Sequence, residues 1–454
     1  MARDLERPPL PRGPYLVVGL ARSGVAAALA LGRTGSVVAC DAATPPEALA
    51  ERERLERAGV EVHLDTDGMQ LLARSPAPRT LVKSPGVPLD APVVAEARRL
   101  GIDVVGELEI GWRMLPNEFC AVTGTNGKTT TTELLGAIHQ AAGIPVAVAG
   151  NVGTPLSGLA GELADDALVV CEVSSFQLED SVEFAPETAV FLNFAEDHLD
   201  RHPDQAAYLD AKLRLFANQR PQDVAVLNAA EPALRDAELG RARRVWFGAT
   251  PESDLRVDEG RLVWRGEPLM EASELGLRGP HNLENSMAAA AAALARGVEP
   301  EPVRAALRDF RGLEHRLELV AEIGGVAYVN DSKATNVAAA TAALRSFDRV
   351  HAILGGSMKG TGFEALAPVV AERCRACYLI GEAAERLAAD LAGAGVELVL
   401  CGDLGRAVAE AADRARPGET VLLAPACASY DQYANFEERG EHFRALVGER
   451  ERAA

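Results

Sequence analysis

Short apolar runs alternate with helix-like segments along the chain, and this alternation predicts an α/β protein. Close to the N-terminus, apolar residues 16–18 and 37–40 flank a helical pattern at 24–31, with glycines on both sides of the helix. A strand, a helix and a second strand in this order indicate a βαβ unit with parallel strands. Further strand-like runs at 80–82 and 102–105 complete a first domain, which we place at residues 1–112.

A second block begins with the apolar run 119–122, a glycine-rich turn and a helix whose apolar residues Leu134, Leu135 and Ile138 share one face. Two more apolar runs, 167–171 and 188–192, are each followed by a polar residue. Open α/β sheets bind ligands at the carboxyl ends of their strands, so these polar residues are candidates for a site. The block extends through a helix at 301–309 to a linker at 310–314, which gives a central domain at residues 113–312.

The third block, residues 313–454, again alternates strands with helical runs and predicts a second doubly wound sheet. The predicted fold is therefore α/β with three domains: a Rossmann-like N-terminal domain, a central P-loop ATPase-like domain with a mainly parallel sheet, and a C-terminal Rossmann-like domain. The strands expected in the third domain are 326–329, 351–354, 376–380, 397–400 and 421–424.

Length and charge restrict the class of protein. A chain of 454 residues is longer than a domain with a single hydrophobic core usually is, and its length favours about three domains. The net charge of −20 excludes a nucleic-acid polymer as the expected partner, because such binding needs a basic face that displaces counterions. Any phosphate-bearing ligand must instead be held by local lysines, arginines and backbone amides.

Cysteine usage and apolar stretches indicate the compartment. Seven scattered cysteines are typical of a reducing environment, and residues 1–14 lack the apolar core of a signal peptide. The longer apolar stretches are alanine-rich and shorter than a bilayer span, so we expect no membrane insertion and a cytoplasmic location. Cys374 and Cys377 form a C-x-x-C pair without a second pair, and we interpret them as inert core residues.

The glycine-rich turn after residue 123 is the strongest chemical signal. It reads Gly124-Thr125-Asn126-Gly127-Lys128-Thr129-Thr130. Glycines let successive N–H groups point at phosphate oxygens, the lysine supplies a cation, and the hydroxyl of Thr129 suits Mg²⁺. The common phosphate loop carries a further glycine where this chain has Val122. A glycine-rich turn with a chance lysine is the alternative interpretation.

Other polar residues bear on the reaction without deciding it. Glu172 ends an apolar run and suits a carboxylate that holds Mg²⁺ beside a phosphate loop, with a helix cap as the alternative. The polar segment 193–202 is either a solvated loop or a second cation site. Gly19, Gly24 and Asp41 weakly resemble a dinucleotide fingerprint. An oxidoreductase would use this fingerprint and leave the phosphate loop idle, and a regulatory nucleotide-binding module would need no chemistry at all.

Seven motifs occur together and in order from about residue 15 to the end: 124–129, 150–153, 172–178, 196–200, 281–282, 315–316 and 330–336. In this combination the chain resembles the Mur ligase family, the ATP-dependent amino-acid ligases of peptidoglycan precursor synthesis. The short phosphate loop is the form that this family uses. The runs 174–178 and 429–432 are similar to the members that add D-glutamate, and they argue against members that add L-alanine or a diamino acid, and against folate ligases.

The resemblance implies a reaction and its participants. ATP would phosphorylate the carboxylate of UDP-N-acetylmuramoyl-L-alanine, and the amine of D-glutamate would attack the acyl phosphate. The substrates would be these three small molecules, the metal would be Mg²⁺, and the chain would act as a monomer.

The resemblance also implies a role for individual residues. The catalytic and metal group would be Lys128, Thr129, Glu172, His198 and Lys212, the last as a carbamate, although Lys212 otherwise fits the wet side of an amphipathic helix. Tyr430, Ala42 and Ala43 depart from the family pattern and leave local contacts open. Residues 124–130 with Asn282, Asn285, Arg316 and Asp331 would bind ATP; Arg22, Ser23, Asp41, Gly86, Asn151 and His198 would bind the UDP substrate; Lys333, Thr335, Lys359, Ser429, Tyr430 and Phe436 would bind D-glutamate.

Overall fold

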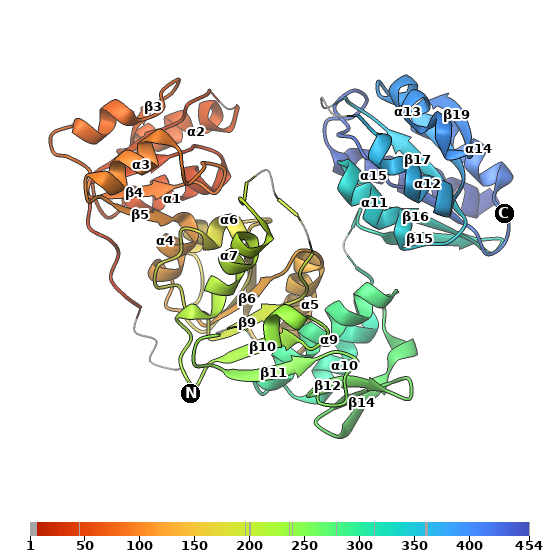
Figure 1. The fold of residues 1–454 in the computed structure, drawn as a ribbon, viewed down its shortest axis with the longest axis horizontal. Coiled ribbons are helices and arrows are strands. Elements are labelled where there is room, and N and C mark those ends of the chain that lie inside the picture. Colours follow the sequence, from red (N-terminus) through yellow and green to blue (C-terminus); the bar gives the residue numbers. More distant parts are fainter. Residues whose placement is uncertain are drawn as a thin grey trace. The chain divides into compact units, whose positions relative to one another are not determined.

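The computed structural model describes residues 7–44, 46–195, 197–198, 201–235, 237, 239–277, 279–312, 314–358 and 362–453. The chain forms two compact units, Met1–Phe310 and Arg311–Ala454. The boundary between them falls in the predicted linker 310–314. Figure 1 shows the elements of both units.

The first sheet contains five parallel strands in the order β3-β2-β1-β4-β5. This order confirms the Rossmann-like arrangement predicted from the N-terminal βαβ pattern. Strands β1 and β4 are neighbours, so the turns that follow them lie at the same edge of the sheet. The elements are β1 (Tyr15–Val18), α1 (Arg22–Gly32), β2 (Val37–Cys40), α2 (Pro46–Arg57), β3 (Glu61–His63), η1 (Met69–Ala73), β4 (Thr80–Lys83), α3 (Pro92–Arg99), β5 (Asp103–Gly106) and α4 (Glu107–Met114).

The second sheet has nine strands in the order β14-β13-β12-β11-β10-β9-β6-β8-β7. The pairings are parallel from β7 to β12, whereas β12 with β13 and β13 with β14 pair antiparallel. Helices α5, α9 and α10 pack on one another, and α9 also packs on the sheet (Figure 1). The elements are β6 (Phe119–Thr123), α5 (Lys128–Ala141), β7 (Val146–Gly150), η2 (Leu156–Leu159), β8 (Leu168–Glu172), α6 (Ser175–Leu178), β9 (Thr188–Phe191), α7 (Gln205–Ala217), β10 (Val224–Asn228), α8 (Pro232–Arg235), β11 (Arg243–Phe247), β12 (Leu255–Asp258), β13 (Arg261–Trp264), β14 (Glu267–Glu271), η3 (Ala272–Glu274), α9 (Pro280–Ala295) and α10 (Pro300–Asp309).

The unit Arg311–Ala454 contains a six-stranded sheet in the order β15-β16-β20-β17-β18-β19. Only the pair β15 and β16 is antiparallel among its described pairings. The elements are β15 (Glu318–Ile323), β16 (Val326–Asn330), α11 (Val337–Arg345), β17 (Val350–Gly355), η4 (Glu364–Leu366), α12 (Ala367–Arg373), β18 (Cys374–Ile380), α13 (Ala384–Leu391), η5 (Ala392–Ala394), β19 (Glu397–Gly402), α14 (Leu404–Arg414), β20 (Thr420–Leu423) and α15 (Phe436–Ala453).

These three mainly parallel sheets confirm the predicted fold class. The boundary that we predicted at residue 112 lies inside α4 (Glu107–Met114), so the bounds of the domains within the first unit stay a prediction. All seven cysteines are free and buried, in keeping with the interpretation of Cys374 and Cys377 as core residues. Within the described ranges, no helix has both the length and the apolar character that a membrane crossing needs.

Candidate active site

The phosphate-loop motif forms the predicted strand, turn and helix. Strand β6 ends at Thr123, and Gly124 and Gly127 have φ angles of 151° and 81°, which residues with side chains rarely adopt. A Cβ atom at Gly127 would overlap the Asn285 side chain, so this position also needs glycine for space. Helix α5 begins at Lys128, and the amides of residues 128–130 lie in its first turn, where a helix offers no internal acceptor. These amides are available to an anion.

Asn193, two residues after the end of β9, contacts the loop that follows the neighbouring strand β6. Its backbone oxygen accepts the Thr125 N–H at 2.9 Å, and its side-chain oxygen accepts the Asn126 N–H at 2.8 Å. The Asn193 amide group in turn donates to the Asn126 oxygen at 3.2 Å. The amides of Thr125 and Asn126 are therefore committed to the protein. The sequence predicts Asn193 as the polar residue after a strand and as the start of the polar segment 193–202, and its contact with the loop has no signal in the local sequence.

Two lysines meet at the first glycine of the loop. Lys128 Nζ donates to the oxygens of Gly124 at 3.1 Å and Thr125 at 2.9 Å, and Lys212 Nζ donates to the Gly124 oxygen at 2.7 Å. Lys212 is 1% exposed, so its assignment to the wet side of helix α7 is wrong. Burial, aided by the charge of Lys128, lowers the pKa of Lys212 to about 6, although Asp197 and Glu172 act in the opposite direction. Its amine is mostly neutral at pH 7.

Glu172 lies at the end of β8, next to the loop strand β6. Its Oε1 accepts a hydrogen bond from Asn151 Nδ2 at 2.8 Å, whereas its buried Oε2 has no hydrogen-bond partner in the part of the chain that the structure describes. A buried carboxylate oxygen without a partner fits a cation ligand. The alternative of a helix cap fails, because Ser174 caps α6 in a reciprocal capping box with Gln177.

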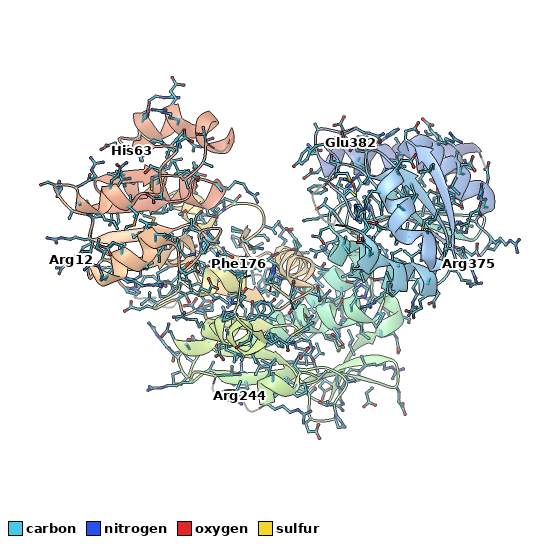
Figure 2. The ribbon with its side chains drawn as sticks, turned by 45° about the horizontal axis from the view of Figure 1, so that its top comes forward. Arg12, His63, Phe176, Arg244, Arg375 and Glu382 are labelled. Carbon is cyan, nitrogen blue, oxygen red and sulfur yellow. The ribbon has the colours of Figure 1, made fainter. Side chains whose placement is uncertain are left out.

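The polar segment 193–202 contains two histidines in different environments; Glu196, Leu199 and Asp200 lie outside the described residues. His198 is partly exposed, has a φ of 54°, and contacts the ring of Phe176, which Figure 2 labels, at a centroid distance of 4.9 Å. His202 is buried, where its ring nitrogens lie 3.0 Å from Ser175 Oγ and 3.3 Å from Glu179 Oε1. Burial lowers the pKa of His202. His202 is therefore a packing residue. His198, whose Nε2 lies 3.6 Å from Asp197 Oδ2, is the more exposed of the two and the candidate for a ligand contact.

The predicted adenine-side residues also lie at the loop. Asn285 is buried against Gly127 on α9, and its Nδ2 donates to Asn282 Oδ1 at 3.3 Å. The structure thus brings Asn282, Asn285 and the loop together within the first unit.

The N-terminal candidates gather at the carboxyl edge of the first sheet. Both oxygens of Asp41 accept backbone N–H groups, from Leu20 at 2.6 Å and from Ala43 at 2.9 Å, so the carboxylate shapes the turn itself. A Cβ at Gly24 would overlap the Gly19 oxygen, and one at Gly19 would lie 2.7 Å from Ser84 Cβ. Close packing therefore explains both glycines. Arg22 and Ser23 begin α1, and Gly86 lies in the adjacent turn after β4.

In the second unit, Asp331 is buried beside the start of β15. Its Oδ1 accepts the Leu317 N–H at 3.1 Å, and burial raises the pKa of its carboxyl group to about 6, opposed by that hydrogen bond and by the charges of Arg316 and Lys333. Lys333 Nζ lies 5.9 Å from the ring centre of Phe436. Lys359 lies outside the described residues.

Arg439 joins the remaining D-glutamate candidates and had no role in the sequence analysis. Its buried guanidinium donates to the oxygens of Ser332 at 2.9 Å, Cys427 at 3.2 Å and Ala428 at 3.2 Å. It thereby ties the segment that contains Lys333 and Thr335 to the segment that leads into Ser429. Tyr430, at 71% exposed, is open to solvent.

Residues 122–293 match the Mur ligase middle domain, and residues 315–427 match the Mur ligase glutamate ligase domain. Proteins named UDP-N-acetylmuramoylalanine--D-glutamate ligase are similar over nearly the whole chain. The protein from Acidobacterium capsulatum is 45% identical over 95% of both chains, and that from Solibacter usitatus is 44% identical over 95% of this chain and 97% of its own. This chain belongs to the Mur ligase family.

Solved structures of Mur ligases share the fold at low sequence identity. MurF ligase from Thermotoga maritima, in complex with ADP, has a TM-score of 0.57 at 16% identity and covers 95% of this chain and 98% of its own. The UDP-N-acetylmuramate-alanine ligase MurC from the same organism has a TM-score of 0.56 at 18% identity, covering 96% of this chain and 99% of its own. At such identity the likeness shows the three-domain fold alone.

Membership of the Mur ligase family makes this chain an ATP-dependent ligase. The oxidoreductase and the regulatory module, which we kept open for the sequence, lose their support. The resemblance of the segment 19–41 to a dinucleotide-binding motif does not require a bound dinucleotide. Close packing explains Gly19 and Gly24, and hydrogen bonds to backbone N–H groups explain Asp41.

Proposed function

We propose that this Mur ligase joins D-glutamate to UDP-N-acetylmuramoyl-L-alanine, with conversion of ATP to ADP and phosphate. The observation that carries the proposal is the similarity to ligases of that name over 95% of the chain. The reaction would belong to peptidoglycan precursor synthesis, and a cytoplasmic, monomeric enzyme stays our prediction.

The chemistry requires activation of a carboxylate. An amine does not displace water from a carboxylate in neutral solution, so the γ-phosphoryl group of ATP is first transferred to the substrate carboxylate. The amine of D-glutamate then attacks the acyl carbon, and phosphate leaves. The amides of residues 128–130 and the ammonium of Lys128 are suited to hold the phosphates and to stabilise the charge that develops during transfer.

Mg²⁺ fits the residues beside the loop. Thr129, Glu172, His198 and Lys212 are the proposed ligands, and the unpartnered Oε2 of Glu172 is the feature that supports them. When bound, Mg²⁺ would neutralise phosphate charge. The neutral amine of Lys212 can add to carbon dioxide with loss of one proton, which would turn a buried lysine into an anionic oxygen ligand.

The three substrates would use the groups of residues given by the family resemblance. Asn282, Asn285, Arg316 and Asp331 would complete the ATP site, and Lys333, Thr335, Lys359, Ser429, Tyr430 and Phe436 would bind D-glutamate. Arg22, Ser23, Asp41, Gly86, Asn151 and His198 would bind the UDP substrate. Since the carboxylate of Asp41 is occupied by Leu20 and Ala43, we expect Asp41 to act by shaping the turn.

Phosphate release from ATP tests the proposal. The purified chain is incubated with ATP, Mg²⁺ and UDP-N-acetylmuramoyl-L-alanine, and a panel of D- and L-amino acids is added one at a time. We expect release that depends on D-glutamate and on the UDP substrate. Release with L-alanine or a diamino acid in place of D-glutamate would contradict the proposed specificity while leaving the Mur ligase chemistry intact.

A further inference from the structure

Lys83, the last residue of β4, is a buried cation that the proposed reaction does not use. Its side chain is 0% exposed. Its Nζ donates to the Val87 oxygen at 2.7 Å and the Ser84 oxygen at 3.3 Å, and it forms an ion pair with Asp180 Oδ2 at 2.7 Å. The two backbone oxygens accept hydrogen bonds from the ammonium, and the Asp180 carboxylate faces it as the opposite charge.

Two of these partners are the ends of one turn. The Val87 N–H donates to the Ser84 oxygen at 3.0 Å and closes a turn over residues 84–87, with Gly86 inside it. Lys83 therefore holds the first and the last carbonyl groups of the turn that follows its own strand. Arg201 adds a second donor to the Val87 oxygen at 3.0 Å.

Asp180, the third partner of Lys83, lies on the segment that begins at Glu172, the proposed Mg²⁺ ligand. Helix α6 starts three residues after Glu172, and Asp180 follows shortly after its end. Glu179 accepts a hydrogen bond from Arg201 at 3.0 Å, so Arg201 also joins this segment to the turn. The oxygen of Asp180 further accepts the Gly106 N–H at 3.3 Å, at the end of β5. Lys83 and Arg201 therefore connect the turn 84–87 to residues 179–180, and the Gly106 N–H connects the end of β5 to the same segment.

A cavity of about 750 Å³ lies next to the turn. Pro88, Leu89 and Asp90, which follow Val87 in the chain, line it together with Glu179 and Arg201.

Stabilisation of the fold does not by itself account for the buried ion pair between Lys83 and Asp180. Burial lowers the pKa of Lys83 and raises that of Asp180, because each charge loses its hydration. A well-packed apolar pair would join the two segments without this desolvation, and replacement of buried ion pairs by apolar residues is often neutral or stabilising. An apolar pair would not fix the carbonyl groups of residues 84–87.

We propose that Lys83, Asp180 and Arg201 form a clamp that positions the turn 84–87 for the UDP-sugar substrate relative to Glu172. The inference rests on the proposed function, in which Gly86 of this turn contacts that substrate. Lys83 and Asp180 are positioning residues, since they act through the turn.

Three variants separate positioning from stability. Lys83→Met keeps the length of the side chain but releases both carbonyl groups and leaves Asp180 unpaired. Lys83→Met combined with Asp180→Leu removes both charges and restores apolar packing. Arg7→Met is the matched control, because Arg7 forms another buried ion pair, with Glu187 at 3.0 Å, away from the turn. For each variant the midpoint of thermal unfolding, kcat and the three KM values are measured.

We expect both Lys83 variants to raise the KM for UDP-N-acetylmuramoyl-L-alanine about tenfold, with the KM values for ATP and D-glutamate changed less than about twofold. The double variant should recover thermal stability without recovering this KM, and Arg7→Met should lose stability at an unchanged KM. Recovery of the KM in the double variant, an equal rise in Arg7→Met, or a common rise of all three KM values would overturn the clamp. If the wild-type chain itself does not use the UDP substrate, the proposed function fails first.

Discussion

At the scale of single residues, the site depends on the burial of side chains such as Lys212, which the sequence pattern does not predict. Lys212 has the spacing of a solvent-facing lysine on a helix, yet the fold places its amine against the Gly124 oxygen and 4.5 Å from the centre of the Tyr208 ring. The loss of hydration lowers its pKa, and the lysine becomes a neutral nucleophile instead of a surface cation. Only the family resemblance assigned it a role, because long-range packing decides its environment.

Lys212→Ala tests that role. The variant lacks the amine that would carry the carbamate, so we expect activity to fall by at least about 100-fold, as for other residues that place charge at a reacting centre. Small carboxylates such as acetate or propionate, added to the assay, should restore part of the activity by filling the space of the missing group. Lys128→Ala provides the comparison, since its loss should not respond to carboxylates. A fully active Lys212→Ala would exclude the carbamate.

At the scale of elements, the sequence predicted parallel strands such as β6 and β8 and also the edge strands β5 and β19, but it missed the interior strands β10 and β11. Apolar runs such as 119–122 and 167–171 became the neighbouring strands β6 and β8, because a parallel strand buried on both faces must be apolar along its length. The strands β12, β13 and β14 at one end of this sheet have partly exposed faces and mixed composition, and no apolar run marks them. The contacts of Asn193 with Asn126, of Lys83 with Asp180 and of Arg439 with Ser332 could not be predicted, because the partners are far apart in the sequence.

Asn193 shows how one strand end supports the loop of another. Asn193→Ala removes the side chain that accepts the Asn126 N–H, so we expect the loop to lose its fixed geometry and the KM for ATP to rise about tenfold, with the other KM values little changed. Asn228→Ala is a suitable control, because Asn228 ends β10 and donates to the Leu192 oxygen at 2.8 Å without touching the loop. Equal effects of the two variants on the KM for ATP would contradict a specific role of Asn193.

Helix α5 also carries a pH-dependent contribution to stability. Burial lowers the pKa of His139 to about 4, and its Nδ1 lies 2.7 Å from the Leu135 oxygen. Because the unfolded chain binds the proton near pH 6.5 and the folded chain does not, the contribution of His139 is complete above pH 6.5 and is lost as the pH falls towards 4. His139→Leu should remove about 3 kcal/mol of this pH dependence, measured by urea unfolding at pH 4 to 7. If the free energy of unfolding varied with pH in the same way for the variant and the wild type, His139 would not contribute this pH dependence.

At the scale of the whole molecule, the proposed ATP contacts come from both units. The loop residues, Asn282 and Asn285 belong to Met1–Phe310, whereas Arg316 and Asp331 follow the boundary at Phe310 and Arg311. The sequence indicated this boundary through a linker at 310–314, but linker composition does not determine how two units associate. If the proposed contacts form, ATP would contribute binding free energy to the association of the two units, and the substrates would then influence the conformation of the chain.

Small-angle X-ray scattering can measure this influence. We expect the radius of gyration to decrease when a non-hydrolysable ATP analogue and UDP-N-acetylmuramoyl-L-alanine are added together, because their contacts with both units favour association. Arg316→Ala should retain the loop at Gly124 and therefore bind the analogue, while the decrease becomes smaller because one contact from the second unit is gone. Calorimetry on the same samples verifies that the analogue is bound. Identical scattering curves with and without bound ligands would contradict the expected effect of the substrates on the association of the units.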